Sequence, residues 1–150
     1  FVERCENVVA FGLPGRGKTD YLSAVAHELV LRHQYRVYFT ATFKLVQQLL
    51  EAKANLQLEA MLKKLDRFDV IILDDLGYVK QTREEMEVLF TFFAERYERK
   101  SVMISSNRVF SEWDQIFHDP MTAMAAVDRL VHHSVLLEFG GGSYRAGGKK

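Results

Sequence analysis

The most constraining feature of this sequence is the run GLPGRGKT at residues 12–19, which matches the pattern G-x-x-x-x-G-K-[ST]. An apolar run, residues 7–11, precedes it, and a segment with helical spacing of apolar residues, 18–33, follows it. A strand, a glycine-rich loop and a helix in this order predict a loop whose backbone amides bind phosphate groups. The chain is therefore expected to hold a nucleotide at this point.

The residue types in the loop indicate how it would bind a nucleotide. Glycine permits backbone conformations that other residues avoid, so the loop amides can point inward at phosphate oxygens. The helix that begins near Lys18 adds the positive end of its dipole. Lys18 is expected to reach the β- and γ-phosphates, and the Thr19 hydroxyl to coordinate Mg²⁺. The expected nucleotide-binding residues are Gly12, Pro14, Gly15, Arg16, Gly17, Lys18, Thr19 and Asp20.

Strand-like and helix-like runs alternate along the chain. The expected strands are 7–11, 36–40, 69–75, 101–107 and 134–139, and the expected helices are 18–33, 42–54, 57–66, 82–99 and 120–132. Thr82 is the expected N-cap of its helix, with Glu85 as its capping-box partner. This alternation predicts an α/β fold with a mostly parallel sheet, in which ligands bind at the carboxyl ends of strands.

Apolar residues predict which side of a segment is buried. The stripe expected to face the core from helix 18–33 contains Leu22, Val25, Ala26, Leu29 and Val30. The aromatic residues near the second strand, expected in the core, are Tyr35, Tyr38 and Phe43.

Composition narrows the class of protein. The chain has 48% hydrophobic and 27% charged residues with a formal net charge of +0, so a nucleic acid would have to bind a local basic patch. A single cysteine excludes an internal disulfide, and no run approaches the roughly 18 apolar residues of a membrane span, so a cytoplasmic location is expected. Residues 1–140 are expected to form one domain and residues 141–150 a flexible tail, in a chain that lacks its first segment.

Two carboxylates, Asp74 and Asp75, follow the apolar run 70–73. In phosphate-loop ATPases a carboxylate at this strand tip holds the Mg²⁺ shell, so Asp74 is predicted to share the metal with Thr19. Asp75 is the candidate general base for the attacking water. Aspartate is shorter than the glutamate often found there, so hydrolysis is expected to be slow. Taken alone, the pair could equally be two solvated carboxylates at a strand end.

Two further polar residues are candidates for catalysis. Asn107 ends the fourth expected strand, where an amide can bind the γ-phosphate and the attacking water as AAA+ sensor residues do; the alternative is a turn residue or helix cap. Arg129 is the candidate arginine finger, which would reach the γ-phosphate of a neighbouring subunit in an oligomer. It could instead pair with Asp128, and Arg108 is the weaker candidate for the finger.

The motifs together resemble a known family. The segments GLPGRGKT, VIILDDLGY (70–78), ISSNRVFSEWDQIFHDP (104–120) and DRLVHHS (128–134) are similar to those of IstB-type ATP-binding proteins, the AAA+ helpers encoded by bacterial insertion sequences. The resemblance runs from about Arg4 to Arg145, and it extends to the DnaC-type helicase loaders. Arg16 and Asp20 depart from it, because the family has a small residue or threonine and a histidine there.

The resemblance implies a fold and a function. The fold would be a three-layer P-loop NTPase with an AAA+ core and a parallel five-stranded sheet in the order 5-1-4-3-2. The protein would hydrolyse ATP with Mg²⁺, form ATP-bound homo-oligomers on duplex DNA and guide a transposase. Residues 42–66 correspond to a region that faces DNA in the family; the basic residues here are Lys44, Lys53, Lys63, Lys64 and Arg67, although a solvated helix face remains the alternative.

Two other functions stay open. A helicase loader would use the same nucleotide site but would bind single-stranded DNA, which favours exposed aromatic residues that stack on bases. A nucleotide-gated scaffold would bind ATP with little turnover, as Asp75 and Asp20 would allow.

Overall fold

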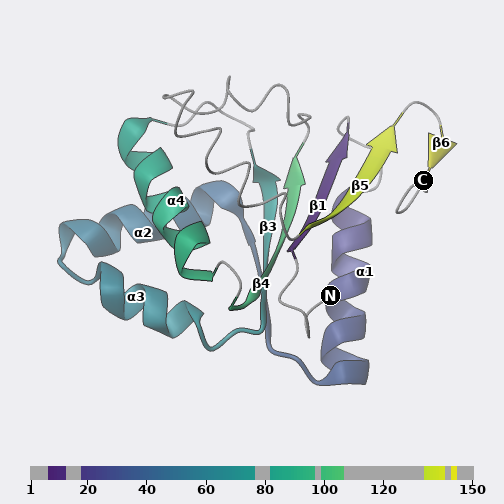
Figure 1. The fold of residues 1–150 in the computed structure, drawn as a ribbon, viewed down its shortest axis with the longest axis horizontal. Coiled ribbons are helices and arrows are strands. Elements are labelled where there is room, and N and C mark those ends of the chain that lie inside the picture. The colour runs from purple at the N-terminus through teal and green to yellow at the C-terminus, as the bar shows by residue number, and fades with distance from the viewer. Residues whose placement is uncertain are drawn as a thin grey trace.

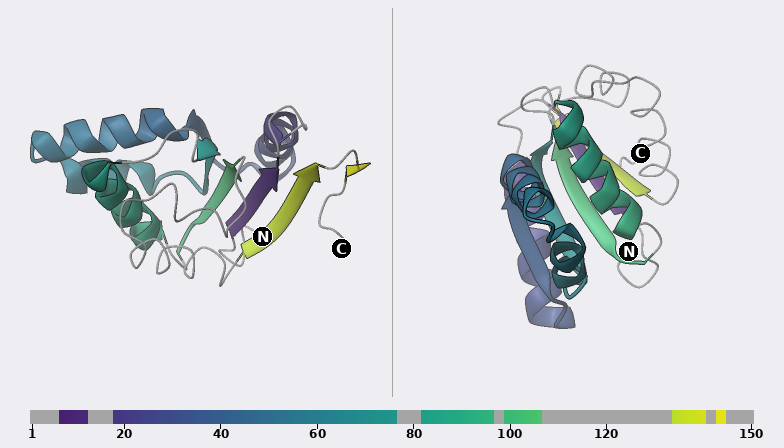
Figure 2. Two further views of the ribbon diagram at one scale, coloured as in Figure 1. Left: turned by 90° about the horizontal axis from the view of Figure 1, so that it is seen from above. Right: turned by 90° about the vertical axis from the view of Figure 1, so that its left-hand side faces the viewer.

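The computed structural model describes residues 7–12, 18–76, 82–96, 99–106, 134–140 and 143–144, and the expected helix at 120–132 lies outside them. This part of the chain forms a sheet with helices on both faces (Figures 1 and 2). The strands are β1 (Asn7–Gly12), β2 (Val37–Ala41), β3 (Val70–Leu76), β4 (Ser101–Ser106), β5 (Ser134–Gly140) and β6 (Ser143–Tyr144). The helices are α1 (Lys18–His33), α2 (Thr42–Ala54), α3 (Leu58–Leu65) and α4 (Arg83–Arg96).

The sheet has the strand order β2-β3-β4-β1-β5-β6. All pairs from β2 to β5 are parallel, and β6 pairs antiparallel with β5. The predicted α/β fold and the predicted order 1-4-3-2 are confirmed. Beyond β1 the sheet continues with β5, and β6 takes two residues from the segment expected to be a tail. Parallel strands bring their carboxyl ends to the same edge, which is where the predicted site residues belong.

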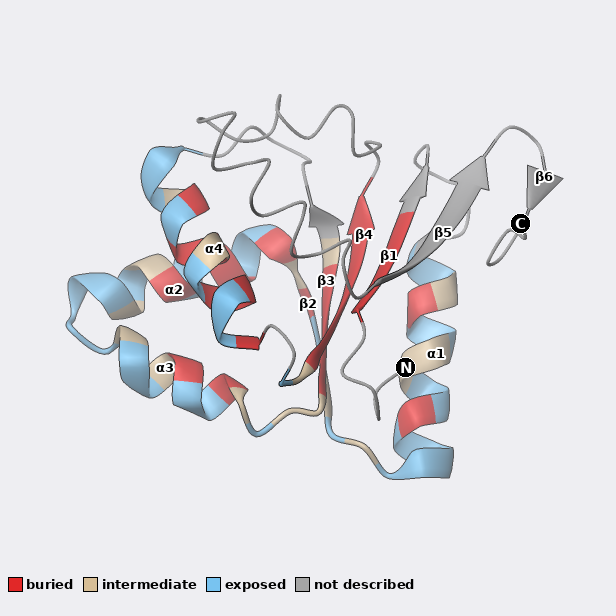
Figure 3. Ribbon diagram, viewed as in Figure 1, coloured by how far each residue is buried: buried red, intermediate tan, exposed pale blue. Residues whose placement is uncertain are grey.

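The two faces of the sheet are covered by different helices, which explains the continuous apolar run in β3. Ile71 and Leu73 pack in a core with α2, α3 and α4, whereas Val70 and Ile72 pack in a second core with α1. All four residues are buried, and Figure 3 shows the buried side chains of the helices on the sides that face the sheet. Among the described residues, no helix is both long and apolar enough to cross a membrane.

Two of the predicted core positions are wrong. Val30 is 46% exposed, because it lies one residue beyond the buried Leu29 and therefore about 100° further round α1. Phe43 is 55% exposed, because α2 turns its apolar side, which contains Leu45 and Leu49, toward the sheet. Both residues are apolar, so their chemistry alone did not show which side of the helix they occupy.

The predicted capping box at the start of α4 is confirmed. The backbone N–H of Thr82 donates to Oε1 of Glu85 at 2.8 Å, and the backbone N–H of Glu85 donates to Oγ1 of Thr82 at 3.2 Å. These bonds satisfy two amide groups that have no partner within the helix. Gln47 of α2 also donates to Glu85, at 3.2 Å, so the same carboxylate joins the start of α4 to its neighbour.

The end of α4 contains Arg96, a buried cation that the sequence did not reveal. Its side chain is 1% exposed and donates to three carbonyl oxygens, those of Leu65, Phe68 and Ser101, each at 3.0 Å. These carbonyls belong to the end of α3, the approach to β3 and the start of β4. One guanidinium therefore joins three elements at the edge of the sheet opposite the phosphate loop. It also marks the end of α4, which the sequence predicted three residues later.

Burial affects the ionisation of Arg96. Loss of water around the guanidinium lowers the pKa of Arg96 from 12.5 to about 10, while Asp66 acts in the opposite direction. The group remains charged at neutral pH, where its five N–H donors suit a site made of carbonyl oxygens. A charged residue at the end of an otherwise polar helix surface normally faces solvent, so only the packing shows its role.

Replacing Arg96 is expected to destabilise the fold strongly. Arg96→Met would keep an unbranched side chain but leave three inward-facing carbonyls without their donor, at about 1–3 kcal/mol for each buried group left unsatisfied. We expect the free energy of unfolding, measured by urea denaturation, to fall by roughly 3 kcal/mol or more. Arg99→Met is the control, because its ion pair with Asp66 is partly exposed and is worth about 0–1 kcal/mol. Equal losses in the two variants would contradict a special role for Arg96.

Candidate nucleotide site

The predicted site residues differ in how far the structure describes them. Thr19, Asp20 and Asp74 are described with their side chains, and the backbones of Gly12, Lys18 and Asp75 are placed in β1, α1 and β3. The predicted residues outside the described part of the chain are Pro14, Gly15, Arg16, Gly17, Asn107 and Arg129.

Thr19 and Asp74 are 55 positions apart in the sequence and in contact in the fold. The hydroxyl of Thr19 donates to the carboxylate of Asp74, with Oγ1 3.0 Å from Oδ2 and 3.3 Å from Oδ1. Thr19 lies in the first turn of α1, directly after the glycine-rich loop, and Asp74 lies near the carboxyl end of β3. The structure thus brings together the two residues that were predicted to share a metal ion.

Ser105 of β4 is a third member of this group, and sequence reasoning missed it. Its side chain is buried, and its hydroxyl donates to Oδ1 of Asp74. The signal was present in the sequence, because two serines, Ser105 and Ser106, end a strand that is otherwise mostly apolar. Polar residues at the carboxyl end of a buried strand are candidates for a site.

The backbone of Asp74 has a separate contact on the side of β2. Thr42, the first residue of α2, is 1% exposed and its hydroxyl donates to the carbonyl oxygen of Asp74 at 2.9 Å. Ala41 at the end of β2 pairs with Asp74 in the sheet, which places Thr42 beside it. Both the main chain and the side chain of Asp74 are therefore hydrogen-bonded by hydroxyl groups.

The oxygen atoms of Thr19 and Asp74 fit the requirements of Mg²⁺. This ion prefers oxygen ligands at 2.0–2.1 Å in an octahedral arrangement, in which neighbouring ligand oxygens lie about 2.9 Å apart. The observed distance between Oγ1 of Thr19 and Oδ2 of Asp74 is 3.0 Å. Within the described ranges no three His, Cys, Asp or Glu residues cluster. Water and phosphate oxygens would then complete the shell, as they usually do for Mg²⁺.

Asp20 is an exposed carboxylate beside this site. It lies in the first turn of α1, one residue after Thr19. A carboxylate there interacts favourably with the helix dipole, by about 0.3–1 kcal/mol. The same dipole would attract a phosphate group, so Asp20 and a bound polyanion would repel each other across the end of the helix.

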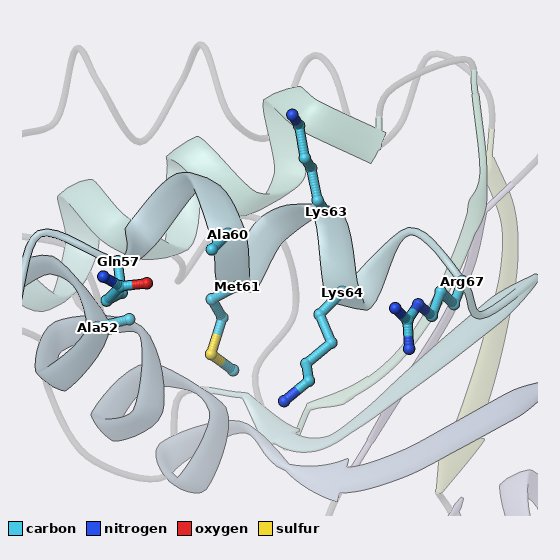
Figure 4. A pocket seen from close by; sticks show the side chains of 7 residues that line it. All are labelled: Ala52, Gln57, Ala60, Met61, Lys63, Lys64 and Arg67. Carbon is cyan, nitrogen blue, oxygen red and sulfur yellow. The ribbon is translucent and has the colours of Figure 1, made fainter.

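A second feature lies beside α2 and α3. A cavity of about 470 Å³ has an apolar part and a basic part, shown in Figure 4. The lining residues are Ala52, Gln57, Ala60, Met61, Lys63, Lys64 and Arg67. The three cations are exposed, and they come from the part of the chain that was expected to contact DNA.

The fold and the contact between Thr19 and Asp74 define a class, the ATP-binding proteins of the AAA+ fold. The crystal structure of the DnaC helicase loader superposes with a TM-score of 0.81 at 21% sequence identity, covering 93% of this chain and 81% of that one. At this identity the likeness concerns the fold alone.

The chain belongs to the family of IstB-like ATP-binding proteins, whose model matches residues 1–150. It is 48% identical over 139 residues to an insertion-sequence ATP-binding protein of Sinorhizobium fredii, covering 93% of this chain and 46% of that protein. It is 41% identical over 145 residues to the ATP-binding protein of insertion sequence IS21 from Pseudomonas aeruginosa, covering 97% and 54%. The predicted resemblance is confirmed, and the chain spans about half the length of these relatives.

Replacing Asp20 by histidine is expected to strengthen ATP binding. A carboxylate a few ångströms from a phosphate group costs about 1 kcal/mol in water and a few kcal/mol at lower effective dielectric. We therefore expect the Kd for ATP, measured by calorimetry, to fall about fivefold or more in Asp20→His. Asp20→Asn separates the loss of negative charge from the gain of an imidazole. Unchanged affinity in both variants would show that Asp20 points away from the phosphates.

Proposed function

We propose that this chain is the ATP-binding and ATP-hydrolysing part of an insertion-sequence helper protein, which acts on DNA together with a transposase. The observation that carries the proposal is the contact of the Thr19 hydroxyl with the Asp74 carboxylate at 3.0 Å. It joins the phosphate-loop motif to the carboxylate that such sites use for magnesium. Membership of the family of IstB-like ATP-binding proteins supports ATP as the nucleotide.

Each predicted residue has a defined task in this proposal. The loop amides and Lys18 bind the phosphates, and Thr19 and Asp74 hold Mg²⁺, which neutralises charge on the β- and γ-phosphate oxygens when it is bound. Asp75 accepts a proton from the attacking water. Asn107 orients that water and the γ-phosphate. The short side chain of Asp75 makes the proposed hydrolysis slow.

The proposed active unit is an oligomer. Arg129 would supply positive charge to the γ-phosphate held by a neighbouring copy, so hydrolysis would depend on assembly. ATP would then control the oligomer, and the oligomer would provide the surface on which DNA and the transposase bind.

The proposed DNA contact is the basic part of the cavity beside α3. Lys63, Lys64 and Arg67 are exposed, and none of them has a side-chain ion pair within the described part of the chain. In contrast, Lys53 lies 3.9 Å from Glu87, so its charge is partly compensated. Cations without partners on a neutral protein suit binding of the phosphate backbone without recognition of sequence.

The exposure of Phe43 supports the alternative of a helicase loader. An exposed aromatic ring can stack on the bases of single-stranded DNA, and Phe43 is 55% exposed at the start of α2. The insertion-sequence relatives at 48% and 41% identity favour the transposition helper instead. Comparison of duplex and single-stranded binding separates the two functions.

Lys18→Ala tests the nucleotide site. Loss of the ammonium group removes charge-assisted contacts worth about 1.5–3 kcal/mol each. We expect the Kd for a fluorescent ATP analogue, measured by anisotropy, to rise at least about 100-fold. Lys44→Ala, which removes an exposed lysine from α2, is the control and should bind like the parent chain. Unchanged affinity in Lys18→Ala would sink the assignment of the phosphate loop.

The double substitution Lys64→Gln and Arg67→Gln tests the DNA contact. We expect ATP-dependent duplex binding to weaken, and the dependence of log K on log salt to become shallower by about 0.9 for each phosphate that the variant no longer neutralises. Arg32→Gln on α1, a 74% exposed cation on the other face of the sheet, is the control. A salt dependence that stays the same would remove this surface from the proposal. Preferred binding of single strands, abolished in Phe43→Ala, would favour the helicase loader.

A further inference from the structure

Asp74 is contacted by more elements than any motif in the sequence indicates. Thr19 of α1 and Ser105 of β4 donate hydrogen bonds to its carboxylate, and Thr42 of α2 donates to its carbonyl oxygen. Thr19 belongs to the phosphate-loop motif, but Ser105 and Thr42 belong to no motif. These two hydroxyls are buried, whereas Thr19 is exposed.

A β-bulge explains why Ser105 reaches Asp74. Leu73 pairs with Ile104 and Leu76 pairs with Ser106, so two residues of β3, Asp74 and Asp75, lie between these pairs opposite the single residue Ser105 of β4. A bulge of this kind changes the direction of side chains and is common beside active sites. The register of β3 and β4 therefore places two consecutive carboxylates opposite one serine.

The direction of the hydrogen bond gives Ser105 a specific effect. The carboxylate torsion of aspartate is broad, so covalent structure alone does not orient the two oxygens. The hydroxyl of Ser105 donates to Oδ1, while Oδ2 is the oxygen nearer to Thr19. One oxygen is held against the strand, and the other is presented toward the start of α1, where the metal is proposed to bind.

We propose that Ser105 is a positioning residue for the magnesium site: its hydroxyl orients the Asp74 carboxylate and thereby sets the affinity of the nucleotide site for the metal. The inference rests on the proposed ATP and Mg²⁺ site. Ser105 touches neither nucleotide nor metal and acts through Asp74. Thr42 complements it by holding the backbone of the same residue from the side of β2.

The test measures how nucleotide binding depends on Mg²⁺, in the whole chain and without reference to turnover. The Kd of a fluorescent ATP analogue is measured by titration across a range of Mg²⁺ concentrations and in excess EDTA. Binding of Mn²⁺ to the nucleotide complex is followed by electron paramagnetic resonance. In Ser105→Ala we expect about tenfold weaker metal binding, the effect of removing one hydrogen bond to a charged group. Binding in EDTA should stay the same, and Ser105→Thr should restore the metal affinity.

Ser106→Ala is the matched control. Ser106 is the next residue of β4, is buried to the same degree and has its side chain on the opposite face of the strand. It should leave the metal dependence unchanged. If Ser105→Ala does not fold, Ser105→Cys replaces it, because a thiol is a poor hydrogen-bond donor and the same loss of metal affinity is expected.

The outcomes separate this inference from the proposed function. If the parent chain binds no nucleotide, or binds it equally well with and without Mg²⁺, the proposed function fails. If the parent depends on Mg²⁺ and Ser105→Ala shows the same dependence, only the role of Ser105 is overturned. Equal losses in Ser105→Ala and Ser106→Ala, together with equal falls in Tm, would assign both serines to packing alone and overturn the inference.

Discussion

Parallel pairing brings the carboxyl ends of β1, β3 and β4 to one edge of the sheet, and each described contact of the site depends on that edge. Thr19 follows β1, Asp74 lies at the end of β3, and Ser105 lies at the end of β4. A parallel sheet requires a crossover after each strand, and here α1 is the crossover that returns over the sheet. Its first turn therefore lies above Asp74, so a strand order and a helix position become a chemical site.

The opposite edge of the sheet is held by a different kind of interaction. Arg96 donates to three carbonyls from segments that enter or leave the sheet there, and its burial has an energetic cost that these bonds offset. The two edges thus differ in chemistry. One edge uses a buried cation to close the backbone, and the other uses hydroxyl groups to orient a carboxylate that remains accessible to a ligand.

Helix α2 connects the nucleotide site with the basic surface. It begins at Thr42, which is bonded to the backbone of Asp74, and after 13 residues, or about 20 Å, it reaches the cavity lined by Ala52 and Lys64. A regular helix transmits a displacement at one end to the other. In the proposed function, this helix is the direct physical link between the metal carboxylate and the surface that would contact DNA.

The sequence alone determined the element order, the phosphate-loop motif, the capping box of Thr82 and Glu85, and the family. These features rest on local patterns, namely periodicity, glycine spacing and caps, which survive in a single sequence. The tertiary structure decided that Val30 and Phe43 face solvent, that Arg96 is buried, and that a bulge sets Ser105 against Asp74. Each of these depends on which distant segments pack against a residue, and the register between β3 and β4 is not encoded in either strand alone.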